Sequence, residues 1–269
     1  MIRNQKIALV AGAMRLPFLV AEDLRRQGYD VFAIGIKNFC NPALKPDLWI
    51  RLGAAGTALK ELKKRKIQKI TMVGALGHPN LSDIRPDFAS IGILARVIRN
   101  QKGYDSMLAA LIAEIEKLGF SVVAAQKLCP SLTFGKGVQT RRKPTKDDLK
   151  DIGRGTEVSK AIGKLDIGQS VVVHGQVMAV EAAEGTAKML SRVFDLQRGY
   201  KKRGGVLVKL VKPGQDLRAD IPAIGAQTVI DAADAKLNGI VVDSKNCWAI
   251  DKDEIIRIAN KRKIFIVAE

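Results

Sequence analysis

The sequence predicts an α/β protein with a Rossmann-like, parallel-sheet N-terminal domain and a separate α/β C-terminal domain. Three observations lead to this prediction. The chain has 269 residues, enough for about two domains. Short apolar segments typical of buried strands alternate with longer segments that have helical periodicity. Residues 128–143, which are rich in glycine, proline and cations, interrupt this alternation and predict a linker.

The first half alternates regularly between strands and helices. The expected strands cover 7–11, 30–35, 69–74 and 120–124, and the expected helices cover 16–26, 53–66 and 104–119. Gly28 follows the first helix, where a glycine commonly ends a helix. Because strand–helix alternation with short turns favours parallel pairing, we expect one parallel sheet covered by helices.

The second half is also expected to be α/β. With the boundary inside 130–142, the predicted domains are 1–134 and 135–269. Thr145, followed by Asp147 and Asp148, predicts a helix start, since threonine caps helices and acids favour their amino termini. The expected helices cover 145–164, 185–195 and 251–262, and 224–237 is expected to include another. The expected strands cover 170–173, 177–181, 204–211, 239–242 and 263–267. The first two of these strands predict a hairpin.

Charge is the clearest signal in the composition. The chain has 45 Lys and Arg against 27 Asp and Glu, a formal net charge of +18, and both halves carry an excess of cations. A folded basic protein implies an anionic partner, which can be nucleic acid, a phosphorylated metabolite or an acidic membrane surface. Aromatic residues make up 5% of the chain, which leaves few platforms for stacking bases. We therefore expect no nucleic-acid partner, and a basic nucleic-acid-binding protein stays as an alternative.

Cysteines and histidines restrict the metal chemistry. Cys40, Cys129 and Cys247 are widely spaced and form no CxxC pair, which argues against a zinc knuckle and favours a reducing compartment. Two histidines are too few for a two-metal phosphoesterase. A metal site would therefore use carboxylate and backbone oxygens, the ligands of Mg²⁺ or Mn²⁺. No apolar stretch is long enough for a bilayer span or a signal peptide, so we expect a cytosolic or peripheral protein.

Residues 209–222 contain the most informative group of charges. A predicted buried strand ends at Lys212, a Pro-Gly turn follows, and Asp216, Arg218 and Asp220 come next. Lysine and arginine bind phosphates, and a carboxylate binds the cation that bridges them. The segment therefore suits phosphoryl transfer, with a solvated charged loop as the alternative.

Two further segments join the end of a strand to the start of a helix. The turn at Gly12 and Ala13 can present backbone N–H groups to a phosphate, but its glycines do not complete GxGxxG, so a simple tight turn is the alternative. Glu181 and Glu184 precede Gly185 and Thr186, where a new helix is expected. That helix terminus also favours an anion, and the alternative is that Thr186 caps the helix.

Six motifs follow one another along the chain: AGAMRLP, DIGQSVVV, AVEAAEGT, GGVLVK, KPGQDLRADIPAIG and LNGIVVDS. Together they resemble the LpxI family of UDP-2,3-diacylglucosamine pyrophosphatases of lipid A synthesis, over essentially the whole chain. The resemblance implies Mg²⁺-dependent hydrolysis of UDP-2,3-diacylglucosamine to UMP and 2,3-diacylglucosamine 1-phosphate (lipid X), with the substrate held between two domains. Another nucleotide-sugar enzyme, such as a transferase or an epimerase, is the other alternative.

The resemblance also assigns roles to residues. Asp220, in RADIP, is the expected essential acid, which holds Mg²⁺ or orients the attacking water, and Asp216 is a second candidate for that work. The expected pyrophosphate or sugar-phosphate contacts are Gln169, Thr186, Lys209, Lys212 and Gln215. The expected nucleotide-sugar contacts in the N-terminal domain are Gly12, Ala13 and Gly74. His78 receives no catalytic role.

The charge and the implied lipid substrate together predict a location. We expect peripheral binding to the anionic cytoplasmic face of a bacterial inner membrane, weakened by salt. A homodimer is kept as a possible oligomeric state.

Overall fold

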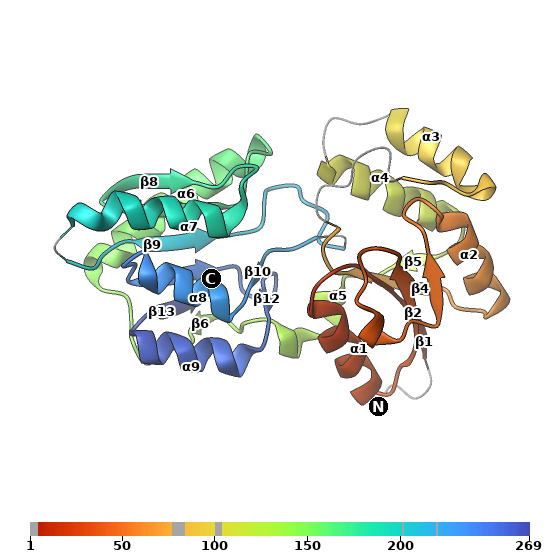
Figure 1. Cartoon of the computed structure of the whole chain (residues 1–269), viewed down its shortest axis with the longest axis horizontal. Coiled ribbons are helices and arrows are strands. Elements are labelled where there is room, and N and C mark those ends of the chain that lie inside the picture. Colours follow the sequence, from red (N-terminus) through yellow and green to blue (C-terminus); the bar gives the residue numbers. More distant parts are fainter. Residues whose placement is uncertain (1–4, 77–83, 100–103, 201, 219) are drawn as a thin grey trace. The chain divides into compact units, whose positions relative to one another are not determined.

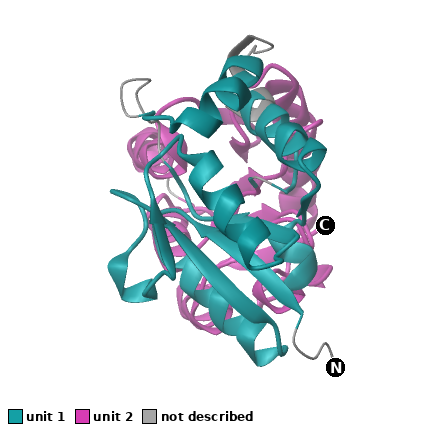
Figure 2. Ribbon diagram, turned by 90° about the vertical axis from the view of Figure 1, so that its right-hand side faces the viewer, with its two compact units in different colours: residues 1–129, 216–220 teal, residues 130–215, 221–269 magenta. Residues whose placement is uncertain are grey.

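The structure, a computed structural model, describes residues 5–76, 84–99, 104–200, 202–218 and 220–269. It consists of two compact units (Figure 2). Unit 1 contains residues 1–129 and 216–220, and unit 2 contains residues 130–215 and 221–269. The short segment 216–220 thus belongs to unit 1, although the sequence on both sides of it belongs to unit 2. His78 lies outside the described residues.

Unit 1 is built on a five-stranded parallel sheet. Its strands are β1 (Lys6–Ala11), β2 (Asp30–Ile36), β3 (Leu48–Ile50), β4 (Lys69–Val73) and β5 (Ser121–Val122). Their order is β3-β2-β1-β4-β5, and every neighbouring pair is parallel. This confirms the predicted Rossmann-like sheet. The winding reverses between β1 and β4, and in open α/β sheets the carboxyl ends at such a point are the usual place for a ligand.

Helices cover both faces of this sheet (Figure 1). They are α1 (Leu16–Arg26), α2 (Ala55–Lys64), α3 (Ile91–Arg99), α4 (Tyr104–Lys117) and α5 (Ala125–Leu128). Apolar residues of α2, α3 and α4, such as Leu62, Val97 and Ile112, pack with β1, β2, β4 and β5 in one buried cluster. Helix α1 contacts β1, β2 and β4 outside that cluster, so it covers the other face.

Unit 2 has a six-stranded mixed sheet. Its strands are β6 (Gly137–Val138), β7 (Ser170–His174), β8 (Gln176–Val180), β9 (Val206–Lys209), β11 (Gly239–Val242) and β13 (Phe265–Ala268), in the order β6-β13-β11-β9-β7-β8. The central strands β13, β11 and β9 are parallel, and β6, β7 and β8 run antiparallel to their neighbours. The predicted β7–β8 hairpin is confirmed. The linker prediction is incomplete, because β6 lies inside 128–143 and pairs with β13.

Two apolar layers stabilise unit 2. The helices of this unit are α6 (Lys146–Lys164), α7 (Gly185–Leu196), α8 (Ala226–Asp234) and α9 (Lys252–Arg262). A small second sheet is formed by β10 (Ala223–Ile224) and β12 (Trp248–Ala249). Residues of α7, α8 and α9 share one buried cluster with the main sheet, whereas Ile152 of α6 packs on its other face. Thr145 and Asp148 form the capping box of α6, which confirms the predicted helix start.

Among the described residues, no helix has both the length and the hydropathy needed to cross a bilayer.

Candidate functional site

One edge of the main sheet in unit 2 gathers polar residues from three strands. Lys209 ends β9 and lies opposite Ser170, the first residue of β7. Glu181 directly follows β8, whose last residue Val180 pairs with Val171 of β7. Because β7 runs antiparallel to both β8 and β9, the end of β9, the start of β7 and the end of β8 lie at the same edge.

A part-buried relay of hydrogen bonds connects the end of β9, the start of α7 and the residue after β8. Lys209, only 7% exposed, donates from Nζ to Thr186 Oγ1 at 2.7 Å, and Thr186 Oγ1 donates to Glu181 Oε1 at 2.8 Å. Ser170 Oγ lies 3.4 Å from the same threonine oxygen. Thr186 is the second residue of α7, and the helix N-cap is Glu184, so the alternative reading of Thr186 as the cap is wrong. The relay therefore lies at the positive end of the α7 dipole.

Two residues at this edge of the sheet each carry a buried acceptor oxygen. Glu181 Oε2 and Gln169 Oε1 have no hydrogen-bond partner among the residues that the structure describes. The backbone oxygen of Gln169 accepts from the N–H of Leu210 at 3.1 Å, which places Gln169 beside the end of β9. The structure thus brings together three of the predicted contact residues, Gln169, Thr186 and Lys209.

Lys212 and Gln215, two other predicted contacts, occupy the turn after β9. The backbone N–H of Gln215 donates to the Lys212 oxygen at 3.1 Å, and Gln215 Oε1 accepts from the Lys212 N–H at 3.3 Å. The Lys212 ammonium forms an ion pair with Asp166 at 2.7 Å. These two residues therefore stabilise their own turn, and the charge of Lys212 is already balanced in part.

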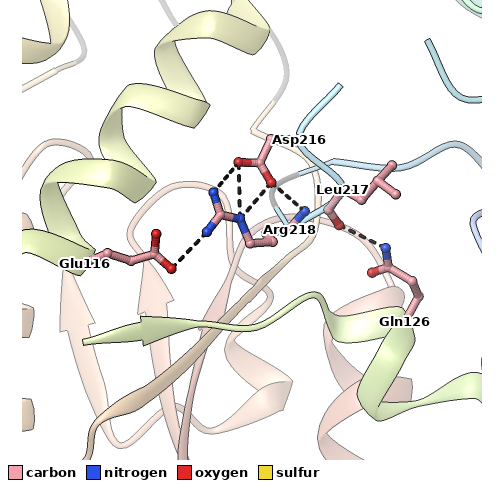
Figure 3. Close-up of polar contacts among 5 residues, drawn as sticks. All are labelled: Glu116, Gln126, Asp216, Leu217 and Arg218. Atoms are coloured by element: carbon pink, nitrogen blue, oxygen red, sulfur yellow. Dashed lines mark hydrogen bonds and ion pairs between the residues drawn. The ribbon is translucent and has the colours of Figure 1, made fainter. Parts of the chain in front are cut away.

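Segment 216–220 is held to the rest of unit 1 by polar contacts (Figure 3). Arg218 forms a bidentate ion pair with Asp216, with Nη2 to Oδ2 at 2.6 Å and Nε to Oδ1 at 2.9 Å. The Nη1 atom of Arg218 reaches Glu116 Oε1 of α4 at 2.8 Å. The buried Gln126 of α5 donates from Nε2 to the Leu217 oxygen at 3.0 Å. Hydrogen bonds from Arg218 lower the pKa of the Asp216 carboxyl below its usual value.

Asp220, the predicted essential acid, is exposed at the end of this segment. Its backbone N–H donates to the Asp216 oxygen at 3.4 Å, so both predicted acids share one short turn. The described part of the chain contains no group of three His, Cys, Asp or Glu side chains that could hold a metal ion. A metal at Asp220 would therefore need oxygen ligands from a bound phosphate or from water.

The turns after β1 and β4 meet at the switch point of unit 1. The N–H groups of Gly12 and Ala13 donate to the oxygens of Val73 and Ala75, each at 2.8 Å. A Cβ atom on Gly12 would lie 2.6 Å from the Gly74 oxygen, which explains why glycine occupies this close approach. The predicted residues Gly12, Ala13 and Gly74 are therefore neighbours. The two N–H groups already donate to backbone oxygens, so in this conformation they are not available to a phosphate.

Sequence reasoning overlooked the partners of the predicted residues. It singled out Glu181 as an acid at a strand end but did not connect it with Lys209, and it gave no partner to Arg218. The only local signal for the relay was the five-residue spacing of Glu181 and Thr186 across a strand–helix junction.

These features define a class: an α/β protein of two units whose polar clusters combine cations, carboxylates and a helix amino terminus, the groups that bind phosphorylated ligands. Comparison with known families is more specific. The family model of the LpxI N-terminal domain matches residues 6–132, and that of the LpxI C-terminal domain matches residues 135–267. The chain belongs to the LpxI family. It is similar to the UDP-2,3-diacylglucosamine pyrophosphatase LpxI of Caulobacter vibrioides, with 32% identity over 271 residues that cover 98% of this chain and 97% of the relative.

Proposed function

We propose that this protein hydrolyses the pyrophosphate bond of UDP-2,3-diacylglucosamine in a Mg²⁺-dependent reaction of lipid A synthesis. The products are UMP and 2,3-diacylglucosamine 1-phosphate, known as lipid X. The observation that carries this proposal is the similarity to the Caulobacter pyrophosphatase along nearly the full length of both chains. The match to both domains of the family supports it, because the chain retains each of the parts that the family combines.

The residues of the unit 2 edge are assigned to phosphate binding. The Lys209 ammonium carries three N–H bonds, and the described residues accept one of them, at Thr186. Its remaining N–H bonds and the amino end of α7 suit the oxygens of a pyrophosphate or sugar phosphate. Gln169 adds an acceptor that suits a hydroxyl or amide donor of the substrate. Lys212 and Gln215 are assigned to the same group of contacts, and Gly12, Ala13 and Gly74 to the nucleotide sugar.

Asp220 is assigned to the chemical step. The residue is exposed on segment 216–220, where solvent and substrate can reach it. Mg²⁺ in phosphate sites commonly uses one or two protein carboxylates together with substrate oxygens and water, so a single exposed aspartate suits it. Asp216 is the weaker candidate, since Arg218 already binds both of its oxygens. When bound, the cation neutralises charge that builds up on phosphate oxygens.

The reaction itself is a simple displacement. A water oxygen forms a bond to one phosphorus, the bridging P–O bond breaks, and the bridging oxygen leaves with the other phosphate. The water proton passes to a basic group, for which the carboxylate of Asp220 is our candidate. Fixed cations stabilise the negative charge that develops on the non-bridging and leaving oxygens. Lys209 is our candidate for this role.

Peripheral binding to an anionic membrane is the location that we propose. The net charge of +18 favours an acidic surface. Unit 1 also exposes apolar residues that lie close in sequence to a cation. Phe88, in the 3₁₀-helix η3 (Phe88–Ser90), is 94% exposed, and Ile91 and Arg85 are exposed near it in sequence. Such a combination suits the interfacial region of a bilayer that contains acidic lipids.

The reaction can be tested with isotopic water. Purified protein is incubated with UDP-2,3-diacylglucosamine in H₂¹⁸O, with Mg²⁺ or with EDTA, and both products are analysed by mass spectrometry. We expect equal amounts of UMP and lipid X, one ¹⁸O atom in one of the two products, and no turnover in EDTA. Absence of both products in Mg²⁺, or products without label, would contradict hydrolysis by this protein.

A further inference from the structure

The relay at the unit 2 edge has a direction that the donors and acceptors determine. An ammonium group only donates, so the Lys209–Thr186 hydrogen bond makes the threonine oxygen an acceptor. A hydroxyl has one proton, and a carboxylate only accepts, so that proton goes to Glu181. Glu181 therefore fixes the rotation of the Thr186 hydroxyl and keeps its lone pairs turned toward Lys209.

Burial makes this arrangement electrostatically important. Glu181 and Lys209 are 8% and 7% exposed, so neither charge is well solvated. A buried charge is costly unless it is paired and hydrogen-bonded. Thr186 links the two opposite charges by hydrogen bonds of 2.8 and 2.7 Å. Glu181 thus provides the countercharge that keeps an ammonium group at this edge.

The second oxygen of Glu181 distinguishes the residue from an ordinary buried carboxylate. Buried side-chain oxygens in folded proteins usually have a hydrogen-bond partner. Glu181 Oε2 has none within the described residues. Within the described residues, the carboxylate therefore makes its side-chain hydrogen bond through Oε1, to the relay. Departures from such packing rules are expected most often at functional sites.

We propose that Glu181 is a positioning residue, which acts through the Thr186 hydroxyl to hold the Lys209 ammonium in place for an anionic phosphate oxygen. Glu181 itself touches neither the phosphate nor the attacking water. This inference rests on the proposed function for the identity of the phosphate, and it adds a residue to which that function assigned no role. Glu184 offers a matched control, because it is an acid three residues away that pairs with Arg192.

The test compares Glu181→Gln, Thr186→Val, Thr186→Ser, Lys209→Met, Glu184→Gln and the double variant of Glu181→Gln with Lys209→Met. Each protein is titrated by calorimetry with inorganic pyrophosphate without Mg²⁺, and its kcat and KM for UDP-2,3-diacylglucosamine are measured. We expect Glu181→Gln, Thr186→Val and Lys209→Met each to weaken pyrophosphate binding about tenfold or more, since each removes or misdirects a charge-assisted hydrogen bond. Glu184→Gln should change it by less than about twofold.

Two comparisons separate positioning from a structural role. The double variant should bind pyrophosphate no more weakly than Lys209→Met alone, since Glu181 acts through that ammonium. Thr186→Ser should retain wild-type affinity because it keeps the hydroxyl. Additive losses in the double variant, or equal losses in the serine and valine variants, would overturn the proposal. If this binding pattern is found but the wild type releases no UMP, the proposed function fails and the role of Glu181 stands.

Discussion

Arg218 and Glu116 form an ion pair, with Nη1 and Oε1 2.8 Å apart, that joins positions 102 residues apart in the sequence. Arg218 uses the other edge of its guanidinium for Asp216, so one side chain fixes both the segment and its first acid. Gln126 adds a hydrogen bond to the Leu217 oxygen. The conformation of the segment that carries Asp220 therefore depends on residues of α4 and α5.

Loss of the Arg218–Glu116 ion pair should lower catalytic activity more than the free energy of unfolding. The Arg218 and Glu116 side chains are 33% and 38% exposed, and such pairs contribute about 0–1 kcal/mol to the free energy of unfolding. We expect Glu116→Gln to shift the urea midpoint slightly and to lower kcat several-fold. Lys117→Gln, a change of charge at the next position, serves as the control. An unchanged kcat in Glu116→Gln would show that the pair does not position the catalytic segment.

The Asp216–Arg218 pair should make stability depend on pH in the acid range. The pKa of the folded carboxyl lies below its usual value of 3.8 because Arg218 donates to it, so ionised Asp216 favours the folded state. This contribution is complete above the unfolded pKa and is lost as the pH falls through the lower folded value. Urea unfolding of wild type and Asp216→Asn should therefore show a difference at neutral pH that narrows below about pH 4. A difference that stays constant, or grows on acidification, would rule out this linkage.

The cysteines should be unreactive in the folded protein. Cys40, Cys129 and Cys247 are free and buried, and burial raises the pKa of the Cys247 thiol to about 12. The thiolate is the reactive form, so little of it exists at neutral pH. We expect a colorimetric disulfide reagent to titrate three thiols quickly in urea and very slowly without it. Fast reaction of any thiol in native buffer would contradict the buried placement.

Membrane binding should depend on both charge and Phe88. Sedimentation with vesicles should show binding to acidic lipid that weakens with salt, and little binding to neutral lipid. Phe88→Ser should weaken binding to acidic vesicles without changing the melting temperature, because the ring is exposed. Phe194→Ser provides a control, since Phe194 is an exposed aromatic residue of unit 2. Equal binding to neutral and acidic vesicles would argue against the electrostatic part, and an unaffected Phe88→Ser protein would argue against insertion of the ring.

Local sequence patterns were sufficient to predict the elements that depend on interactions between residues close in the sequence. The Thr145 cap, the β7–β8 hairpin and the strand–helix alternation of unit 1 follow from side chains within a few residues. Strands β3, β6, β10 and β12 have two or three residues each, too few for a recognisable period, and tertiary pairing defines them.

In the candidate site, too, some features follow from neighbouring residues in the sequence and others from tertiary pairing. The sequence indicated that Thr186 lies near the start of a helix. It placed Lys209 inside an expected strand over 204–211, whereas β9 ends at Lys209 in the structure. That Thr186 and Lys209 meet follows from the antiparallel placement of β7 between β8 and β9, which no local pattern contains. The Arg218–Glu116 pair is also invisible locally, because its partners lie in different halves of the chain.

The most direct test of the central claim is the release of UMP and lipid X by wild type and by Asp220→Asn at equal concentration with saturating Mg²⁺. The substitution keeps the size of an exposed side chain, so the two proteins should melt at the same temperature. We predict equimolar UMP and lipid X from the wild type and a loss of at least about a hundredfold in kcat for the variant, as general-base catalysis and metal binding both require the carboxylate. Wild-type turnover in Asp220→Asn, or no turnover in the wild type, would contradict the account.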